Sequence, residues 1–389
     1  MEAVNRLAGV GEQSEIARTA RSGLVGLVAS LEDAIGRCPH DEGREPAIEL
    51  ISRLNKILAD WPAAARPVAT SAADAKPVAT SPAVPRPGHG PDDGLRALAA
   101  AFVGDPAARE YLDEQSLAAL AGAAADGAEL WRTLHLCLLR LPGPAADSWR
   151  AELAAFAVPE TAGHAGWRTL PGELETILVA PGPLGATRAE GIRTSARGLI
   201  PDDVLAALGP DGREPGPGAT ELARLSALLL HLSELDDNLV LCLESVLYMG
   251  SRRLDGKYRQ LYRADLLGRL REYARREPGS PGALEALVEI DEALNSLTHR
   301  PPAAGGSWWA QVRQQSRRMV DRAAAALNEA GADVEILPLG LRYRDVRDLT
   351  AGNDVAFRSG GKPGDVLACL KLWTRIGDRV IPGRVMYRA

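Results

Sequence analysis

The chain has 389 residues, 46% hydrophobic and 25% charged, which is enough for two or three domains around at least one sizeable core. Its formal net charge of −6 argues against a partner such as nucleic acid that is bound through overall charge. It contains no continuous apolar window long enough to span a membrane, so we expect no membrane partner.

The first part of the chain, residues 1–61, predicts a helical hairpin. Apolar residues at helical spacing cover residues 14–37 and again the stretch from Pro46 to Trp61. Two helices alone cannot bury both apolar faces, so we expect the hairpin to dock on a partner or elsewhere on the chain. Residues 62–93 are rich in Pro, Ala, Ser and Thr and contain PVATS twice, which predicts a semi-rigid linker rather than a docking peptide.

Residues 94–218 predict a helical domain with an irregular tail. The helical pattern covers residues 94–158, and its nearly all-apolar run from Leu130 to Leu139 predicts a core helix. Residues 159–218 are broken by Pro and Gly, and only residues 170–179 and 201–208 predict short elements there.

Residues 219–330 predict a long helix and a helical bundle. Thr220 is a suitable N-cap, and no proline interrupts the chain from there to Glu277, although three glycines allow breaks. Leucines follow alternating three- and four-residue steps, with Asp236 at one core position, and such an apolar seam predicts a homodimer. The alternative is that residues 94–158 fold back and cover the seam. The seam consists of Leu222, Leu225, Leu229, Leu232, Leu239, Leu243 and Val246.

Two shorter helices and a small β-domain complete the pattern. Ser280 begins a helix that reaches Leu297, and Ser307 begins another that Gly331 terminates. Residues 331–389 then predict a small β-domain, with strands at 334–337, 355–357, 365–373 and 380–387. The Pro-Gly pair at 382–383 predicts a bulge or an edge strand. The chain therefore predicts a mainly α fold with helical N-terminal modules, a long helix, a helical bundle and a C-terminal β-domain.

Five short segments of the C-terminal region share their order and spacing with one protein family. They are Leu287–Leu294, Leu327–Gly340, Asn353–Ala356, Pro363–Leu367 and Gly383–Ala389. In that order they resemble the segments L-x-x-V/I-L-D-N-L-E, L-x-x-x-G-V-x-x-I-x-x-x-G, H-E-A-V, P-G-T-V and G-R-V-L-R-P-A of the GrpE family. The resemblance covers about residues 220–389, and Asn353 departs from the family's histidine.

This resemblance implies a nucleotide-exchange factor or co-chaperone. Its β-domain would wedge open the nucleotide cleft of a DnaK-type chaperone ATPase by binding a minor conformer selectively. The alternative is a non-enzymatic scaffold or adaptor of a multi-component bacterial system that keeps the fold without exchange activity. A plainer interpretation leaves the arginines of the last hairpin in solvent and its tryptophan in the core. The candidate partner contacts are Trp373, Arg375, Arg379, Gly383 and Arg384.

The sequence contains none of the motifs that would indicate an enzyme, such as GxSxG, HExxH, a P-loop or GxGxxG. Asp354, Asp365 and Lys371 form no plausible nuclease set, because the last two lie far apart along one predicted strand. The four cysteines are dispersed, without CxxC, and the first residues do not have the pattern of a signal peptide. We therefore expect no catalytic residue, cofactor or metal, and a cytoplasmic location.

Overall fold

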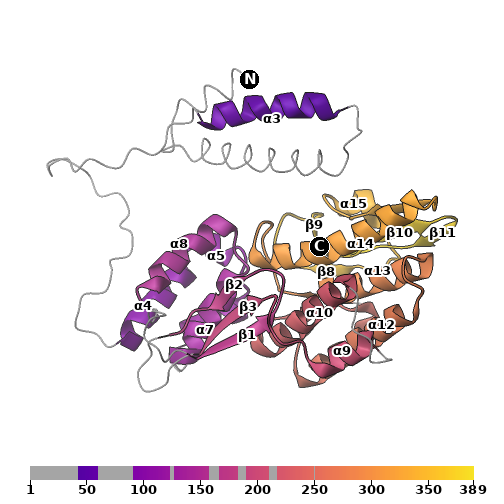
Figure 1. Cartoon of the computed structure of the whole chain (residues 1–389). Helices are drawn as coiled ribbons and strands as arrows, with labels where there is room; N and C mark the ends of the chain where they lie inside the picture. The colour runs from indigo at the N-terminus through magenta and orange to yellow at the C-terminus, as the bar shows by residue number, and fades with distance from the viewer. Residues whose placement is uncertain are drawn as a thin grey trace. The chain divides into compact units, whose positions relative to one another are not determined.

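The computed structural model describes residues 43–59, 91–122, 127–156, 166–182, 190–209, 217–248 and 250–389 (Figure 1). The chain divides into two compact units, Met1–Ser81 and Pro82–Ala389, with the boundary inside the stretch predicted as a linker. The helix predicted at residues 14–37 and most of that linker lie outside the described residues. None of the helices in the described ranges is both long and apolar enough to cross a membrane.

The first unit contributes α3, Arg44–Ala59, to the described structure. This helix matches the second helix of the predicted hairpin. Pro46 lies in its first turn, where the missing N–H of proline is not needed for an intrahelical bond.

The second unit opens with helices, as the sequence predicts. The nearly all-apolar run forms α7, whose Leu130, Trp131 and Leu134 are at most 2% exposed. Asp105 and Asp113 begin two of the short helices by accepting hydrogen bonds from Ala107 N and Ser116 N at 2.9 and 2.7 Å. The helices are α4 Pro91–Gly104, α5 Pro106–Arg109, α6 Glu114–Ala121, α7 Gly127–Leu138 and α8 Gly143–Ala154.

The tail of this region contains more regular structure than predicted, because three strands in its described residues form a sheet. Its strands are β1 Trp167–Pro171, β2 Thr176–Val179 and β3 Gly191–Ser195, in the order β1-β3-β2. The sequence did not indicate β3, since Ile192 is its only large apolar residue and no alternation stands out. A Cβ at Gly191 would lie 2.7 Å from the Trp167 ring, so the close packing here requires glycine. The other predicted short element forms α9, Asp202–Leu208.

The stretch from Thr220 to Glu277 forms two separate helices, α10, Pro217–Leu235, and α12, Gly256–Arg275, rather than one continuous helix. The first break lies at Asp236, before the three glycines at which the sequence allowed breaks. Asp236 supplies the physical reason for the first break. Its carboxylate accepts hydrogen bonds from Asn238 N at 3.0 Å and from His299 Nε2 at 2.8 Å. A side chain bonded to its own backbone two residues on competes with helix continuation. Between the helices lie β4 Val240–Leu241, α11 Glu244–Leu247 and β5 Arg252–Arg253.

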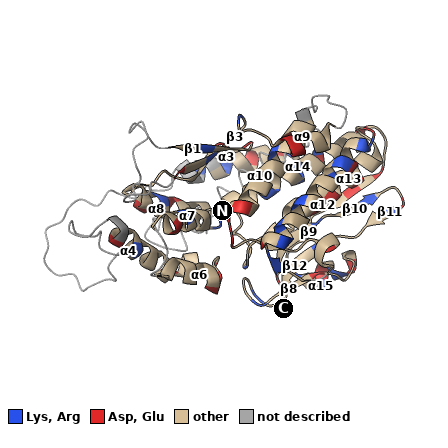
Figure 2. Cartoon of the chain, turned by 90° about the horizontal axis from the view of Figure 1, so that it is seen from below, with Lys and Arg blue, Asp and Glu red and all other residues tan. Residues whose placement is uncertain are grey.

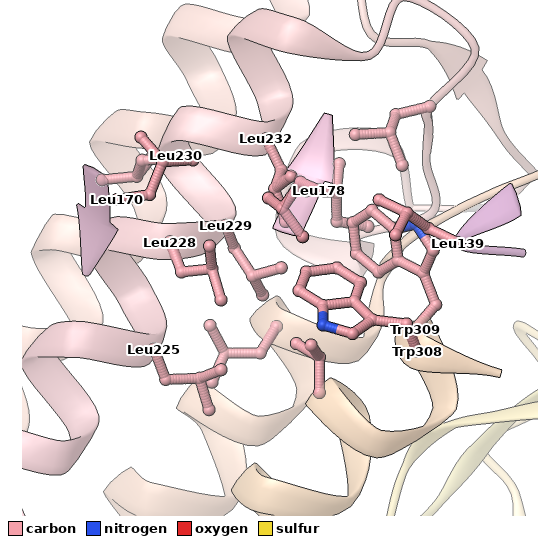
Figure 3. Close-up of a cluster of buried hydrophobic side chains, with 14 of the residues drawn as sticks. Leu139, Leu170, Leu178, Leu225, Leu228, Leu229, Leu230, Leu232, Trp308 and Trp309 are labelled. Carbon is pink, nitrogen blue, oxygen red and sulfur yellow. The ribbon is translucent and has the colours of Figure 1, made fainter. Parts of the chain in front are cut away.

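The apolar seam is buried inside the chain. Its six leucines are at most 2% exposed, and Val246 is half-buried. α10 packs against β1, α9, α12 and α14, and Figure 3 shows its leucines facing Trp308, Trp309 and Leu139. The chain itself therefore covers the seam, mainly with these elements rather than with residues 94–158. The homodimer remains a prediction, but the surface on which it was based is not exposed.

The two shorter helices form as predicted. They are α13, Pro281–Asn295, and α14, Trp308–Glu329. Ser280 and Ser307 cap them by accepting hydrogen bonds from Ala283 N and Ala310 N, both at 3.1 Å. Gly331 follows α14 with φ 90°, a left-handed conformation that glycine adopts without steric cost.

The C-terminal region forms small sheets on these helices. β7 packs on α14 and β9 on α13. The Pro-Gly pair at 382–383 separates β11 from β12, so the last predicted strand is in fact two strands in different sheets. The remaining elements are β6 Leu297–Thr298, β7 Val334–Leu337, α15 Tyr343–Val346, η2 Arg347–Leu349, β8 Val355–Phe357, β9 Val366–Lys371, β10 Trp373–Ile376, β11 Arg379–Ile381 and β12 Arg384–Arg388. The sheet orders are β5-β4-β6, β11-β10-β7 and β8-β12-β9.

One large hydrophobic cluster extends from Leu95 on α4 to Leu372, which precedes β10. It includes residues of all three regions that the sequence assigned to separate domains, so the boundaries at 218 and 330 do not divide this core. The mainly α fold class is confirmed for the described residues. The C-terminal sheets belong to the same compact unit as the helices.

Candidate functional site

The sheet β11-β10-β7 has one face that packs inward and one that is open to solvent. Residues directly opposite each other in the register point to the same face. Val334 and Thr374 are buried on the inner face, and Ile336 and Ile376 pack there against the main core. The opposite side, which we call the outer face, consists of Glu335, Leu337, Trp373, Arg375 and Val380. Leu337 is 37% exposed and Val380 50% exposed, so the outer face offers apolar surface to solvent.

The register separates the two arginines that the sequence grouped together. Arg375 lies on the outer face, where it pairs with Asp333 at 2.5 Å and with Glu335 at 3.1 Å. Arg379 lies opposite Ile376 on the other face, and its exposed guanidinium reaches Glu285 of α13 at 2.7 Å. Both arginines are surface residues in ion pairs. Only Arg375 shares a face with the exposed apolar residues.

Trp373 is half-buried at one end of the outer face. It packs against a small cluster formed by Leu339, Val346 and Val385. Its side chain therefore contributes to packing and is also partly exposed. Trp373 is thus partly a core residue and partly a surface residue, and the sequence had left open whether it packs in the core or contacts a partner.

Gly383 is a packing position. Its φ is not in the left-handed region, but a Cβ built on it would lie 2.5 Å from Leu339 Cδ1 and 3.0 Å from Trp373 N. The chain between β11 and β12 therefore passes closely against β10. A partner contact through Gly383 would have to use its backbone.

Replacing Gly383 with alanine is expected to lower the free energy of unfolding by about 1–3 kcal/mol, because the added methyl group overpacks the contact with Leu339. Urea unfolding followed by tryptophan fluorescence measures this change. Gly340→Ala is the matched control, since a Cβ there meets nothing within 4 Å. Equal stability of the two variants would contradict the packing role.

Arg384 is not available as a surface contact, so the expectation that it binds a partner is corrected. The residue is 1% exposed. Its Nε donates to Asn353 O at 3.0 Å, and its Nη1 donates to Cys242 O. The guanidinium thus joins β12 to the loop before β8 and to Cys242, the residue after β4, which is a structural role.

Around Arg384 lies a charge cluster that the sequence did not reveal. We call it the buried charge cluster, although Glu289 at its edge keeps 39% of its side chain exposed. We define it as Arg269, Glu289, Glu292, Lys371 and Arg384. Lys371 Nζ lies 2.5 Å from Glu289 Oε1 and 3.5 Å from Glu292 Oε2. Arg269 Nη1 lies 2.8 Å from Glu289 Oε2 and 3.2 Å from Glu292 Oε2, and Arg384 Nη1 lies 3.8 Å from Glu292 Oε1. The cluster ties α12, α13, β9 and β12 together.

The charges of the cluster are unequally compensated. Burial opposes the ionisation of Glu289, but Lys371 and Arg269 outweigh it and lower the pKa of that carboxyl. Burial raises the pKa of Glu292, although Lys371 and Arg269 act in the opposite direction. Its Oε1 accepts no hydrogen bond from the described residues. The charged residues of α12 are mostly basic and those of α13 are all acidic, so opposite charges lie on neighbouring helices (Figure 2).

A local signal for this cluster existed in the sequence. Glu292 interrupts an apolar helical run, and Lys371 ends an apolar strand, positions where a charge requires a buried partner. The pairing itself joins residues that are far apart in sequence. Asp354 and Asp365, which the sequence offered as a possible set with Lys371, have other partners than Lys371. Asp354 accepts a hydrogen bond from Thr350 at 2.7 Å, and Asp365 pairs with Arg342 at 2.8 Å.

A groove of about 590 Å³ opens beside the buried charge cluster. It is lined by Glu244 to Tyr248 of α11 and its C-cap, by Arg269 of α12, and by Glu289 and Glu292 of α13. In the part of the chain that the structure describes, no group of three or more His, Cys, Asp or Glu residues could hold a metal ion. No family model, curated protein or solved structure matches this chain.

Proposed function

We propose that the C-terminal region binds a DnaK-type chaperone ATPase through the outer face and promotes nucleotide exchange. The observation that carries this proposal is the exposed pair Leu337 and Val380 beside Arg375, on a sheet whose inner face is fixed to the main core. A rigid, partly apolar surface with an arginine is the kind of surface that forms energetic centres in protein interfaces. The order of α13, α14 and the C-terminal sheets is consistent with the GrpE resemblance.

Exchange requires that the partner's open conformer be bound more tightly than its closed one. A thousandfold faster release of nucleotide corresponds to about 4 kcal/mol of this difference. Two apolar side chains and one arginine desolvated in an interface suffice for a difference of that order. Arg375 would have to exchange Asp333 or Glu335 for an acidic group of the partner, which favours a complementary acidic surface there.

The second candidate function is a scaffold or adaptor that binds the ATPase without promoting exchange. One observation favours it. In the described part of the chain, the break at Asp236 and the covered seam leave no long free helix beside the C-terminal sheets, unlike the arrangement that the resemblance implies. Binding and exchange must therefore be measured separately.

Release of labelled ADP from a DnaK-type ATPase of the same organism tests the proposal. The whole chain is used, because residues 219–389 share their core with the preceding region. We expect the unaltered chain to accelerate release, and Leu337→Ser with Val380→Ser to reduce that acceleration at least about tenfold. Arg375→Ala should act in the same direction. Arg379→Ala on the opposite face is the matched control and should leave acceleration unchanged.

The outcomes separate the two functions. If the unaltered chain binds the ATPase without accelerating ADP release, the exchange function is refuted and the scaffold function remains. Absence of binding would remove both. Equal losses in the outer-face variants and in Arg379→Ala would show that the outer face is not the contact.

A further inference from the structure

Two arginines lie close to Thr298, the last residue of β6. Arg313 of α14 donates a hydrogen bond from Nη2 to Thr298 Oγ1. Arg300 follows Thr298 by two residues, and its Cζ lies 4.7 Å from the centroid of the Phe357 ring. Val240, which is opposite Thr298 in the register, packs in the same cluster as Phe357. Thr298 and the two guanidinium groups therefore lie at the junction between the sheets β5-β4-β6 and β8-β12-β9.

We call Arg300 and Arg313 the arginine pair, because their charges act on the same buried group. Burial raises the pKa of the Cys242 thiol to about 12, and the charges of Arg384, Arg300 and Arg313 all act against this rise. Cys242 packs in the same cluster as Phe357. The arginine pair thus gives this junction a positive potential.

The arginine pair has no carboxylate partner among the residues that the structure describes. Arg300 Nη2 donates to the hydroxyl of Ser251, and Arg313 donates to the hydroxyl of Thr298, so both acceptors are neutral. Arg313 Nε is shielded from solvent and has no hydrogen-bond partner in the same part of the chain. By contrast, Arg317 on the next turn of α14 pairs with the carboxylate of Asp291.

Arg313 keeps its charge at neutral pH. Burial and the nearby charge of Arg317 lower the pKa of the Arg313 guanidinium to about 10, which still leaves it protonated at pH 7. A cation taken out of water without an anion beside it is costly, so this position favours an anionic ligand. Arg300 is exposed and Arg313 is partly exposed, so a small anion can approach from solvent.

We propose that Arg300 and Arg313, together with the hydroxyl of Thr298, bind a phosphate group. A guanidinium donates through a planar fork that fits two phosphate oxygens, and two guanidinium groups match the charge of a dianion. A carboxylate has one charge and two oxygens, so it would satisfy one arginine of the pair. The Thr298 hydroxyl accepts from Arg313 and can donate its own proton to a further phosphate oxygen.

This site lies in a different sheet from the outer face, so the inference does not depend on the proposed exchange activity. Calorimetric titration of the whole chain with sodium phosphate at constant ionic strength tests it, and saturable binding is expected. Arg313→Gln and Arg300→Gln should each weaken binding at least about tenfold, as for the loss of a hydrogen bond to a charged group. Arg300 is exposed, so its variant tests the site even if Arg313→Gln fails to fold.

A second probe distinguishes a free phosphate ion from a phosphate group carried by another protein. This probe is the peptide acetyl-Gly-phosphoserine-Gly-amide, with the unphosphorylated serine peptide for comparison. Tighter binding of the phosphoserine peptide assigns the phosphate group to a modified protein. Tighter binding of inorganic phosphate assigns it to the free ion.

Arg318→Gln is the matched control, because Arg318 is an exposed arginine of α14 more than one turn beyond Arg313. It should bind phosphate as the unaltered chain does. The inference is overturned if neither phosphate probe binds saturably or if the serine peptide binds as tightly as the phosphoserine peptide. It is also overturned if Arg300→Gln or a folded Arg313→Gln binds phosphate as tightly as Arg318→Gln.

Discussion

Replacing Arg384 with leucine is expected to lower the free energy of unfolding by about 3–5 kcal/mol, the usual cost of removing one partner from a buried ionic network. The substitution removes the hydrogen bonds to Asn353 O and Cys242 O. It also removes the cation closest to Glu292 Oε1, leaving that carboxyl more poorly compensated. Chemical unfolding of the second unit, followed by tryptophan fluorescence, measures the loss.

The exposed Arg379→Leu is the matched control for this experiment. Its guanidinium pairs with Glu285 at the surface, so the stability should change by no more than about 0.5 kcal/mol. If Arg384→Leu were as stable as Arg379→Leu, the buried role of Arg384 would be refuted. The residue could then again be considered as a partner contact.

The second large effect is a loss of stability in mild acid. Burial lowers the pKa of His135 to about 4, and burial likewise lowers the pKa of His299 to about 4. The unfolded chain binds a proton at each ring below about pH 6.5, whereas the folded chain does not until about pH 4. The stability is therefore full above pH 6.5 and is lost between pH 6.5 and 4, by about 3 kcal/mol for each ring.

Buried carboxyl groups also make the stability depend on pH, and not all of them in the same direction as the two histidines. Burial raises the pKa values of Asp291 and Glu292, so their contribution to stability grows as the pH falls. The pKa of Asp236 is lowered, because His299, Arg140 and the Asn238 N–H together outweigh the effect of burial, so the contribution of Asp236 is lost only at still lower pH. The dependence of stability on pH is therefore the sum of these contributions. Only a comparison of variants isolates the contribution of one histidine.

His135→Leu isolates the ring on α7. We expect the difference in stability between pH 7 and pH 4.5 to be smaller in this variant than in the unaltered chain, because no buried imidazole needs to remain uncharged. Leu138→Met on the same helix is the matched control, since it changes packing slightly without removing a titratable group. Parallel pH profiles of His135→Leu and the unaltered chain would refute this assignment.

The sequence predicted best the features that are encoded locally. Ser280 and Ser307 cap their helices through bonds to backbone three residues away, and Gly331 ends α14, so each could be identified from neighbouring residues alone. The strands at 334–337 and 355–357 were found for the same reason, whereas most of β10 was not predicted and the last predicted strand is two strands. The break at Asp236 was underestimated, because its carboxylate also depends on His299, which is distant in sequence.

The candidate sites depend on non-local pairing, which sequence patterns do not specify. Arg375 and Arg379 are close in sequence, but the register of β10 and β11 turns them to opposite faces. Arg384 looked like a third surface arginine, yet it is buried by β4 and the loop before β8. The charge network around Glu292 becomes evident only when α12, α13, β9 and β12 are assembled.

The position of β12 in its sheet affects how this region reaches its folded state during synthesis. β12 lies between β8 and β9, which do not pair with each other, although both precede it in the sequence. Until the ribosome has released residues 384–388, both earlier strands lack their hydrogen-bonding partner, and Glu292 lacks Arg384. Unpaired strands expose edges that aggregate readily. Assembly of the β8-β12-β9 sheet must therefore wait until these late residues have left the exit tunnel.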